Sequence, residues 1–121
     1  MVEREGRYLI TQRRAGAILP LLWEFPGGRV EAGESDQLAL KRELLERLEA
    51  DIHVGQLISF VRHRYDHYVV ELYLYECTLL SEELSVRAVH DARWVLSDEF
   101  ERYEFTPADE ASMAKLLGMV T

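Results

Sequence analysis

Two short stretches of sequence decide the fold of this chain: GGRVEAGE at residues 27–34 and RELLE at residues 42–46, with seven residues between them. The first is rich in glycine, which lets the backbone approach a bound metal or phosphate closely. The second belongs to a helical pattern, in which Glu43 and Glu46 lie three residues apart. Their carboxylates then project from neighbouring turns and can share a hard cation. We therefore expect a glycine-rich loop and a carboxylate-bearing helix to form one site.

The helix itself is predicted from Ser35 through about Ala50. Ser35 is a good N-cap residue, and Asp36 follows in the first turn. Leucines recur at helical spacing and fall within one half of the helical wheel, while charged residues occupy the other half. This pattern predicts a buried leucine face and a polar face. The leucines are at positions 38, 40, 44, 45 and 48, and the charged residues are Arg42, Glu43, Glu46 and Arg47.

Short β-prone runs surround this helix at residues 8–12, 52–61, 67–77 and 92–96. Residues 14–33 are punctuated by proline and glycine and are predicted to form an ordered loop with a short strand. A second helix is predicted from Thr106 as cap to Gly118 as its end. The order predicts one mixed α/β domain over residues 1–121. The strand at 8–12 lacks room for a full upstream partner, so either the first strand is stunted or the numbered chain begins inside a natural element.

Composition restricts the function further. The chain has 121 residues, of which 48% are hydrophobic, enough for one packed core and too few residues for a two-domain enzyme. Its net charge of −8 excludes a diffuse basic surface for a DNA or RNA polymer, but not a phosphorylated small molecule bridged by metal. The single cysteine, Cys77, forms no internal disulfide, and no apolar run approaches 18 residues. We expect a cytoplasmic protein without a membrane segment; its oligomeric state is open, a homodimer included.

The pattern Gly-x5-Glu-x7-Arg-Glu-Leu-x-Glu, from Gly28 to Glu46, resembles the Nudix box. The preceding LWEFPGG at residues 22–28 resembles the entry loop of the MutT branch of that family. The resemblance covers most of the chain, because it extends to TQR at residues 11–13, HDARW at 90–94 and FTPAD at 105–109. It implies an α/β fold of the α/β/α sandwich type with a central mixed sheet.

The same resemblance implies a hydrolase that depends on Mg²⁺ or Mn²⁺. Water would attack a nucleoside diphosphate linked to another group, with nucleoside triphosphates as the expected substrates. Gly27 would offer a backbone carbonyl to the metal, Glu43 would be a metal ligand or general base, and Glu46 would be a metal ligand. Glu34 and Arg42 would complete the catalytic set by holding the loop and the helix together.

For substrate binding, the resemblance implies that Arg13 faces the phosphates of the nucleotide. Glu24, Phe25 and Pro26 are expected to form a wall of the cleft beside the box, with Trp23 either near the bound base or packed under the loop. Phe25 and Gly28 are expected to contact the substrate. Asp109 would read the edge of the nucleobase, where a carboxylate prefers a donor such as an amino group. An equally good interpretation makes Asp109 an N3 residue that stabilises the start of its helix.

The chain departs from the family pattern at two positions of the box. Arg47 stands where the pattern has a second glutamate, commonly a metal ligand, and Glu49 stands where it has glycine; Val89 also stands where relatives often carry a later glutamate. Loss of a carboxylate predicts a weakened site for Mg²⁺ or Mn²⁺. Arg47 either pairs with Glu43, four residues earlier, or contacts a substrate phosphate directly. The alternative function is therefore a catalytically impaired Nudix-like module that binds a nucleotide or a protein partner. A third interpretation is an unrelated α/β domain in which the motif arises by coincidence.

Aromatic and histidine side chains gather around the run at residues 67–77. They either stack on a base or belong to an ordinary sheet surface or core, which is the more common role of such residues in strands. A zinc site is rejected, because no further ligands can be identified. The residues are His63, Tyr65, His67, Tyr68, Tyr73 and Tyr75.

Overall fold

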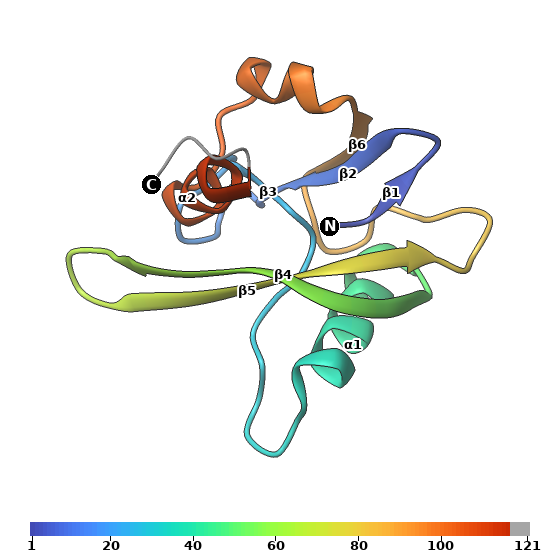
Figure 1. Ribbon diagram of the computed structural model, residues 1–121, viewed down its shortest axis with the longest axis horizontal. Helices are drawn as coiled ribbons and strands as arrows, with labels where there is room; N and C mark the ends of the chain where they lie inside the picture. The colour runs from blue at the N-terminus through green and yellow to red at the C-terminus, as the bar shows by residue number, and fades with distance from the viewer. Residues whose placement is uncertain (117–121) are drawn as a thin grey trace.

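The computed structural model describes residues 1–116, which form a long β-hairpin, a smaller sheet and two α-helices (Figure 1). The hairpin consists of β4 (Ile52–Arg64) and β5 (Val69–Leu79), paired antiparallel. In the smaller sheet, β2 (Arg7–Gln12) pairs antiparallel with β6 (Asp91–Val95) and, at its two ends, with β1 (Glu3–Arg4) and β3 (Trp23–Glu24).

Two parallel bridges join these pieces into one mixed sheet system. Val2 bridges Cys77 of β5, where the Cys77 amide donates to the Met1 carbonyl over 2.8 Å. Trp23 bridges Phe105, just before the second helix. Helices α1 (Asp36–Leu48) and α2 (Pro107–Leu116) lie on opposite sides of the hairpin in Figure 1, and both contact β4. The prediction of an α/β/α sandwich with a central mixed sheet is confirmed.

Helix α1 begins as predicted, because the Ser35 hydroxyl accepts a hydrogen bond from the Leu38 amide over 3.2 Å. It ends two residues earlier than predicted: Glu49 adopts a left-handed conformation with φ of 51°, which stops the helix before Ala50. A left-handed residue after the last turn is a common way to end a helix, although glycine adopts it at lower cost.

The prediction that all five leucines of α1 form its buried face is wrong. Leu44 and Leu48 are buried, but Leu38 and Leu45 are 61% and 58% exposed. The helix buries a stripe that is rotated toward Ala39 and Glu43 instead. The reason is that α1 has two neighbours. The hairpin covers Leu44 and Leu48. The glycine-rich loop covers the adjacent strip of the helix, so closely that a Cβ on Gly28 would meet the Glu43 side chain.

The remaining elements follow the predicted order with shifted bounds. The hairpin strands extend to Arg64 and Leu79, beyond the predicted ends at residues 61 and 77, and a 3₁₀ helix, η1 (Ser97–Arg102), was not predicted. Helix α2 starts at Pro107 and buries Ala108, Asp109 and Ser112. The predicted end of this helix at Gly118 lies outside the described residues.

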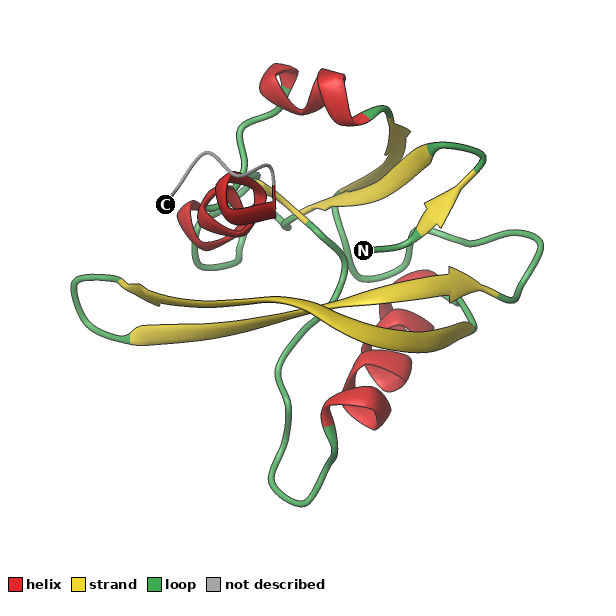
Figure 2. Ribbon diagram, in the orientation of Figure 1, coloured by secondary structure: helices red, strands yellow, loops and turns green. Residues whose placement is uncertain are grey.

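The core has two parts. One packs α1 against β5 and the N-terminus around Leu9, Leu44, Leu48 and Cys77. The other is an aromatic cluster in which Phe25 packs edge-on against Phe100, with ring centroids 5.7 Å apart, below η1. Figure 2 shows the long loop that leaves β3 and reaches the start of α1. Among residues 1–116, no helix is long and apolar enough to cross a membrane.

Candidate active site

A large cleft lies where this loop, α1, β5 and the start of α2 meet. Its volume is about 1010 Å³. Most of the charged side chains come from the loop and α1, and four tyrosines come from the hairpin. The charged lining residues are Arg13, Glu24, Arg29, Glu31, Asp36, Glu43, Arg47, Glu71 and Asp109, and the aromatic ones are Phe25, Tyr65, Tyr68, Tyr73 and Tyr75.

Arg42 fastens the glycine-rich loop to the helix. Its Nε and Nη2 donate to the two carboxylate oxygens of Glu34 over 2.7 and 2.9 Å, and Nη2 also donates to the Arg29 carbonyl over 3.1 Å. Glu34 accepts a further hydrogen bond from the Glu31 amide over 3.0 Å. These donors, Arg42 first, lower the pKa of Glu34 to about 2. The loop between residues 29 and 34 is therefore anchored by a bidentate ion pair.

Glu43 is the buried carboxylate of the site. It is only 7% exposed, and each of its oxygens accepts from a different arginine: Oε1 from Arg42 Nη1 over 3.1 Å and Oε2 from Arg47 Nε over 2.7 Å. The carboxylate lies directly against Gly28, where an added Cβ would come within 2.7 Å of three Glu43 atoms. Only glycine fits at position 28 while Glu43 keeps both partners.

Glu43 and Glu46 do not point to a common place. Glu46 is 60% exposed, does not line the cleft, and approaches only Arg42, at 3.5 Å. The expectation that the two carboxylates share a cation is therefore not met by the positions of their side chains. The reason is that the loop and both arginines draw Glu43 inward, whereas Glu46 faces solvent one turn later.

The side chains predicted to bind a metal ion do not form a cluster of ligands. Within residues 1–116, no three His, Cys, Asp or Glu side chains are placed to hold a metal ion. Gly27 packs on Leu40, while both oxygens of Glu43 are bonded to guanidinium groups, and position 47, next to them, carries a cation. Divalent cations such as Mg²⁺ need several oxygen ligands with free lone pairs. The Glu43 and Glu46 side chains as placed do not fit a resident divalent cation, and the role of the Gly27 carbonyl stays a prediction.

Arg13 and Glu24 form a second ion pair in the cleft. Arg13 Nη1 lies 3.2 Å from both oxygens of Glu24, and Arg13 Nε donates to the Ile18 carbonyl over 2.7 Å. Burial raises the pKa of Glu24, and the adjacent guanidinium opposes that shift. Arg13 thus lines the cleft while bound to Glu24, a residue expected in the cleft wall, and its contact with the phosphates stays a prediction.

Asp109 lines the cleft and is the third residue of α2, which begins directly after the capping residue Thr106. Its Oδ1 accepts from the Phe25 amide over 3.2 Å, its Oδ2 accepts from the Thr106 hydroxyl, and its own amide donates to Thr106 Oγ1 over 3.2 Å. Burial raises the pKa of Asp109 to about 7. The bonds between Asp109 and Thr106 agree with the helix-stabilising interpretation, and the interpretation that Asp109 reads the edge of the base stays a prediction. Trp23 packs against Tyr103 with ring centroids 5.0 Å apart and does not line the cleft.

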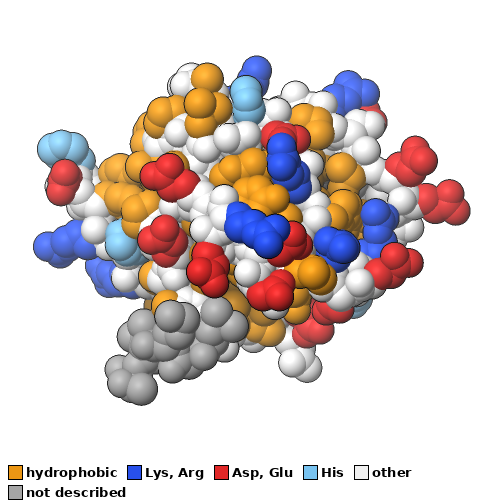
Figure 3. Space-filling model, turned by 90° about the horizontal axis from the view of Figure 1, so that it is seen from above, with side chains coloured by type: hydrophobic (Ala, Val, Ile, Leu, Met, Phe, Trp, Pro, Cys, Tyr) orange, Lys and Arg blue, Asp and Glu red, His pale blue; other side chains and the backbone are white. Residues whose placement is uncertain are grey.

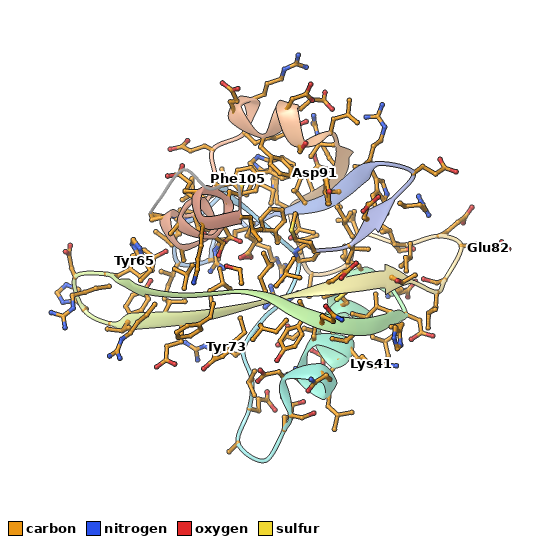
Figure 4. The ribbon with its side chains drawn as sticks, in the orientation of Figure 1. Lys41, Tyr65, Tyr73, Glu82, Asp91 and Phe105 are labelled. Atoms are coloured by element: carbon orange, nitrogen blue, oxygen red, sulfur yellow. The ribbon has the colours of Figure 1, made fainter. Side chains whose placement is uncertain are left out.

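The tyrosines of the hairpin are the site residues that sequence reasoning did not commit to. Tyr65 and Tyr68 stack with centroids 5.0 Å apart, and the Tyr65 hydroxyl accepts from the Ala108 amide over 3.1 Å, on the side of the hairpin that faces α2 (Figure 4). The Tyr75 hydroxyl donates to Asp36 over 2.7 Å, and this bond raises its pKa to about 12. Their clustering near residues 67–77 was the available signal, but it did not distinguish a cleft from a sheet surface.

The chain is similar to known proteins over nearly its whole length. A family model described as "NUDIX domain" matches residues 1–115. The CTP pyrophosphohydrolase of Escherichia coli strain K12 is 32% identical over 118 residues, which cover 94% of this chain and 87% of the relative. The 8-oxo-dGTP diphosphatase of Haemophilus influenzae is 30% identical over 112 residues, which cover 93% and 82% of the two chains.

Solved structures agree with these matches. The solution structure of the E. coli ORF135 protein superposes with a TM-score of 0.77 at 28% identity, over 98% of this chain and 84% of that chain. The solution structure of the DNA mismatch repair protein MutT from methicillin-resistant Staphylococcus aureus superposes with a TM-score of 0.72 at 34% identity, over 98% of this chain and 92% of that chain.

Proposed function

Because this chain belongs to the NUDIX domain family, we propose that it is a pyrophosphohydrolase that acts on nucleoside triphosphates. Two relatives at 30% identity or more are named for such substrates, a CTP pyrophosphohydrolase and an 8-oxo-dGTP diphosphatase, and each match covers more than nine-tenths of this chain. Water would add to a phosphorus atom of the triphosphate while a phosphoanhydride bond breaks. The products would be a nucleoside monophosphate and pyrophosphate.

One observation carries the proposal: a buried carboxylate, Glu43, lies against Gly28 in a cleft of about 1010 Å³. This volume is at the upper end of the range for small-molecule sites, so it accommodates a nucleotide. Arginines in the lining suit phosphates, and the tyrosines suit a base, since aromatic rings stack on bases. The net charge of −8 favours a small phosphorylated ligand over a nucleic acid polymer, and the face in Figure 3 mixes acidic and basic side chains without a continuous basic area.

Each residue of the site then has a proposed task. Glu43 accepts the proton of the attacking water, for which one of its oxygens must first be released from its arginine. Arg42 and Glu34 keep the loop against the helix, so that Glu43 stays in place. Arg13 and Arg47 contact the phosphates, and Phe25 with Asp109 lies near the base. Mg²⁺ or Mn²⁺ would enter the cleft on the phosphates as part of the substrate.

A second candidate function is binding of the nucleotide with little or no turnover. The observation that favours it is the pair of guanidinium groups on Glu43, because a carboxylate with both oxygens engaged is a poor proton acceptor. Both functions place the nucleotide in the same cleft. A cytoplasmic location would give the protein access to free nucleotides under either one.

The discriminating experiment is a phosphate-release screen over the ribonucleoside and deoxyribonucleoside triphosphates, with a pyrophosphatase added and with Mg²⁺ or Mn²⁺ present. Turnover by the wild-type chain that is lost in Glu43→Gln supports the hydrolase and excludes the binding-only function. If no nucleotide is turned over, melting curves with and without nucleotide test binding, because a ligand that binds only the folded state raises its melting temperature. Neither turnover nor stabilisation would contradict both proposals.

A further inference from the structure

We propose that Arg47 takes the place of a resident divalent cation, so that the cleft binds the phosphates of a nucleotide in the absence of metal. This inference rests on the proposed function, because it assumes that the cleft receives a nucleoside triphosphate. Two observations support it: the described residues offer no cluster of three His, Cys, Asp or Glu side chains for a metal ion, and the guanidinium of Arg47 is bonded to the buried carboxylate of Glu43.

Arg42 and Arg47 differ in which of their N–H donors remain available to a ligand. Arg42 uses Nε, Nη1 and Nη2 on Glu34, Glu43 and the Arg29 carbonyl, so it has a structural task. Arg47 is anchored through Nε alone, on Glu43. Its two terminal nitrogens carry four further N–H donors, which make no hydrogen bond to another described residue. Arg47 is also one-third exposed and lines the cleft.

An arginine held through Nε presents its Nη1 and Nη2 groups as a rigid pair of donors. This fork matches the spacing of two oxygens on one phosphate group, which a single lysine ammonium cannot match. The backbone of Arg47 is fixed as well, because its carbonyl accepts from the amides of Arg87 and Ala88 over 2.9 and 3.1 Å. The side chain is therefore anchored at both ends before a ligand arrives, which reduces the entropy lost on binding.

The carboxylates beside Arg47 do not exclude a phosphate from this part of the cleft. Glu43 is bonded to two arginines, and Glu24 is bonded to Arg13. An incoming phosphate would thus meet neutralised carboxylates and the free donors of Arg47. In a site without this arginine, a divalent cation would be needed to bridge the glutamate and the phosphates.

The test is calorimetric titration of the full chain with α,β-methylene-CTP, a triphosphate that cannot be cleaved between its α and β phosphates, in EDTA and in Mg²⁺. We expect the Kd of the wild-type chain in EDTA to lie within about threefold of its Kd in Mg²⁺. Arg47→Gln should weaken binding in EDTA by roughly 10- to 100-fold, as expected for loss of hydrogen bonds to a charged group. Arg47→Lys, which keeps the charge and loses the fork, should fall between the two.

Lys41→Gln is the matched control, because it removes one positive charge from the same helix at an exposed position outside the cleft (Figure 4). It should bind as the wild type does. If Arg47→Gln fails to fold, as judged by its melting curve, Arg47→Lys carries the test. Wild-type binding that requires Mg²⁺, or equal binding by wild type and the Arg47 variants in EDTA, would overturn the inference while leaving the proposed function intact. No binding under either condition would contradict the proposed function itself.

Discussion

Replacing Gly28 by alanine perturbs the site at its tightest contact. The added Cβ would lie within 2.7 Å of three Glu43 side-chain atoms, so the carboxylate must move. Glu43 is buried and bonded to Arg42 and Arg47 over 3.1 and 2.7 Å, so it cannot move without loosening at least one of these bonds. A single methyl group should therefore disturb both the stability of the loop and helix and the position of the proposed base.

The magnitude follows from these contacts. Overpacking of a tightly filled position typically costs about 1–3 kcal/mol, and a hydrogen bond to a charged group contributes about 1.5–3 kcal/mol when it is fully formed. Because Arg47 is partly exposed, water compensates for part of the loss. We expect the free energy of unfolding of Gly28→Ala to fall by about 2 kcal/mol, which corresponds to a decrease in melting temperature of roughly 6–12 °C for a domain of this size. Activity should fall by about 100-fold, because the base is displaced by the order of 1 Å.

Chemical denaturation and turnover of the same preparations measure the two effects. Gly27→Ala is the control for stability, since a Cβ there meets only Leu40 Cδ1 at an ordinary 3.5 Å. Gly16→Ala is the control for activity, since a Cβ there has open space among the described residues. If Gly28→Ala were as stable and as active as these controls, the close packing of Gly28 on Glu43 would be refuted.

Two further predictions concern other parts of the fold. The pKa of Asp109 is raised to about 7 from an ordinary value of 3.8, so the folded state binds this proton more tightly than the unfolded chain does. The stability that this tighter binding provides is present at pH 4 and is lost as the pH rises through 7. Urea denaturation should show that the free energy of unfolding of the wild type is roughly 2–4 kcal/mol lower at pH 8 than at pH 5, and that Asp109→Asn lacks this decrease. Parallel pH profiles for the two proteins would contradict this prediction. Glu49→Gly should raise the free energy of unfolding by about 0.5–1 kcal/mol, because Glu49 has φ of 51° where glycine is favoured. Glu49→Ala is the control, because it also loses the ion pair with Arg87 but has no glycine to relieve the left-handed conformation. If Glu49→Gly melts no higher than Glu49→Ala, the left-handed conformation of residue 49 has no energetic cost.

Local signals in the sequence predicted the framework of the site well. The N-cap at Ser35 and the periodic leucines located α1, and the spacing of the box placed Gly28 beside that helix. The i,i+4 pairing of Glu43 with Arg47 was one of two interpretations open at the start, and the structure contains this ion pair. These features depend on residues close in sequence, which is why the pattern alone revealed them.

Features that depend on contacts between distant segments could not be predicted in this way. The burial of Glu43 arises because the loop covers one side of α1, which the helical wheel treated as a polar face. The tyrosines became cleft residues because the long hairpin passes the starts of both helices, where Tyr65 contacts Ala108 and Tyr75 contacts Asp36. The bonding of Arg13 to Glu24 likewise requires pairing of β2 with β3. Sequence spacing carries no information on such juxtapositions.

The central claim is that the cleft around Glu43 hydrolyses nucleoside triphosphates, and ³¹P NMR tests it most directly. Wild-type chain and Glu43→Gln would be incubated with each triphosphate and Mg²⁺, with folding of the variant verified by its melting curve. The account predicts that monophosphate and pyrophosphate resonances grow with the wild type for at least one nucleotide, and that they do not grow with the variant. Equal turnover by both proteins, or intact triphosphate in every sample, would contradict it.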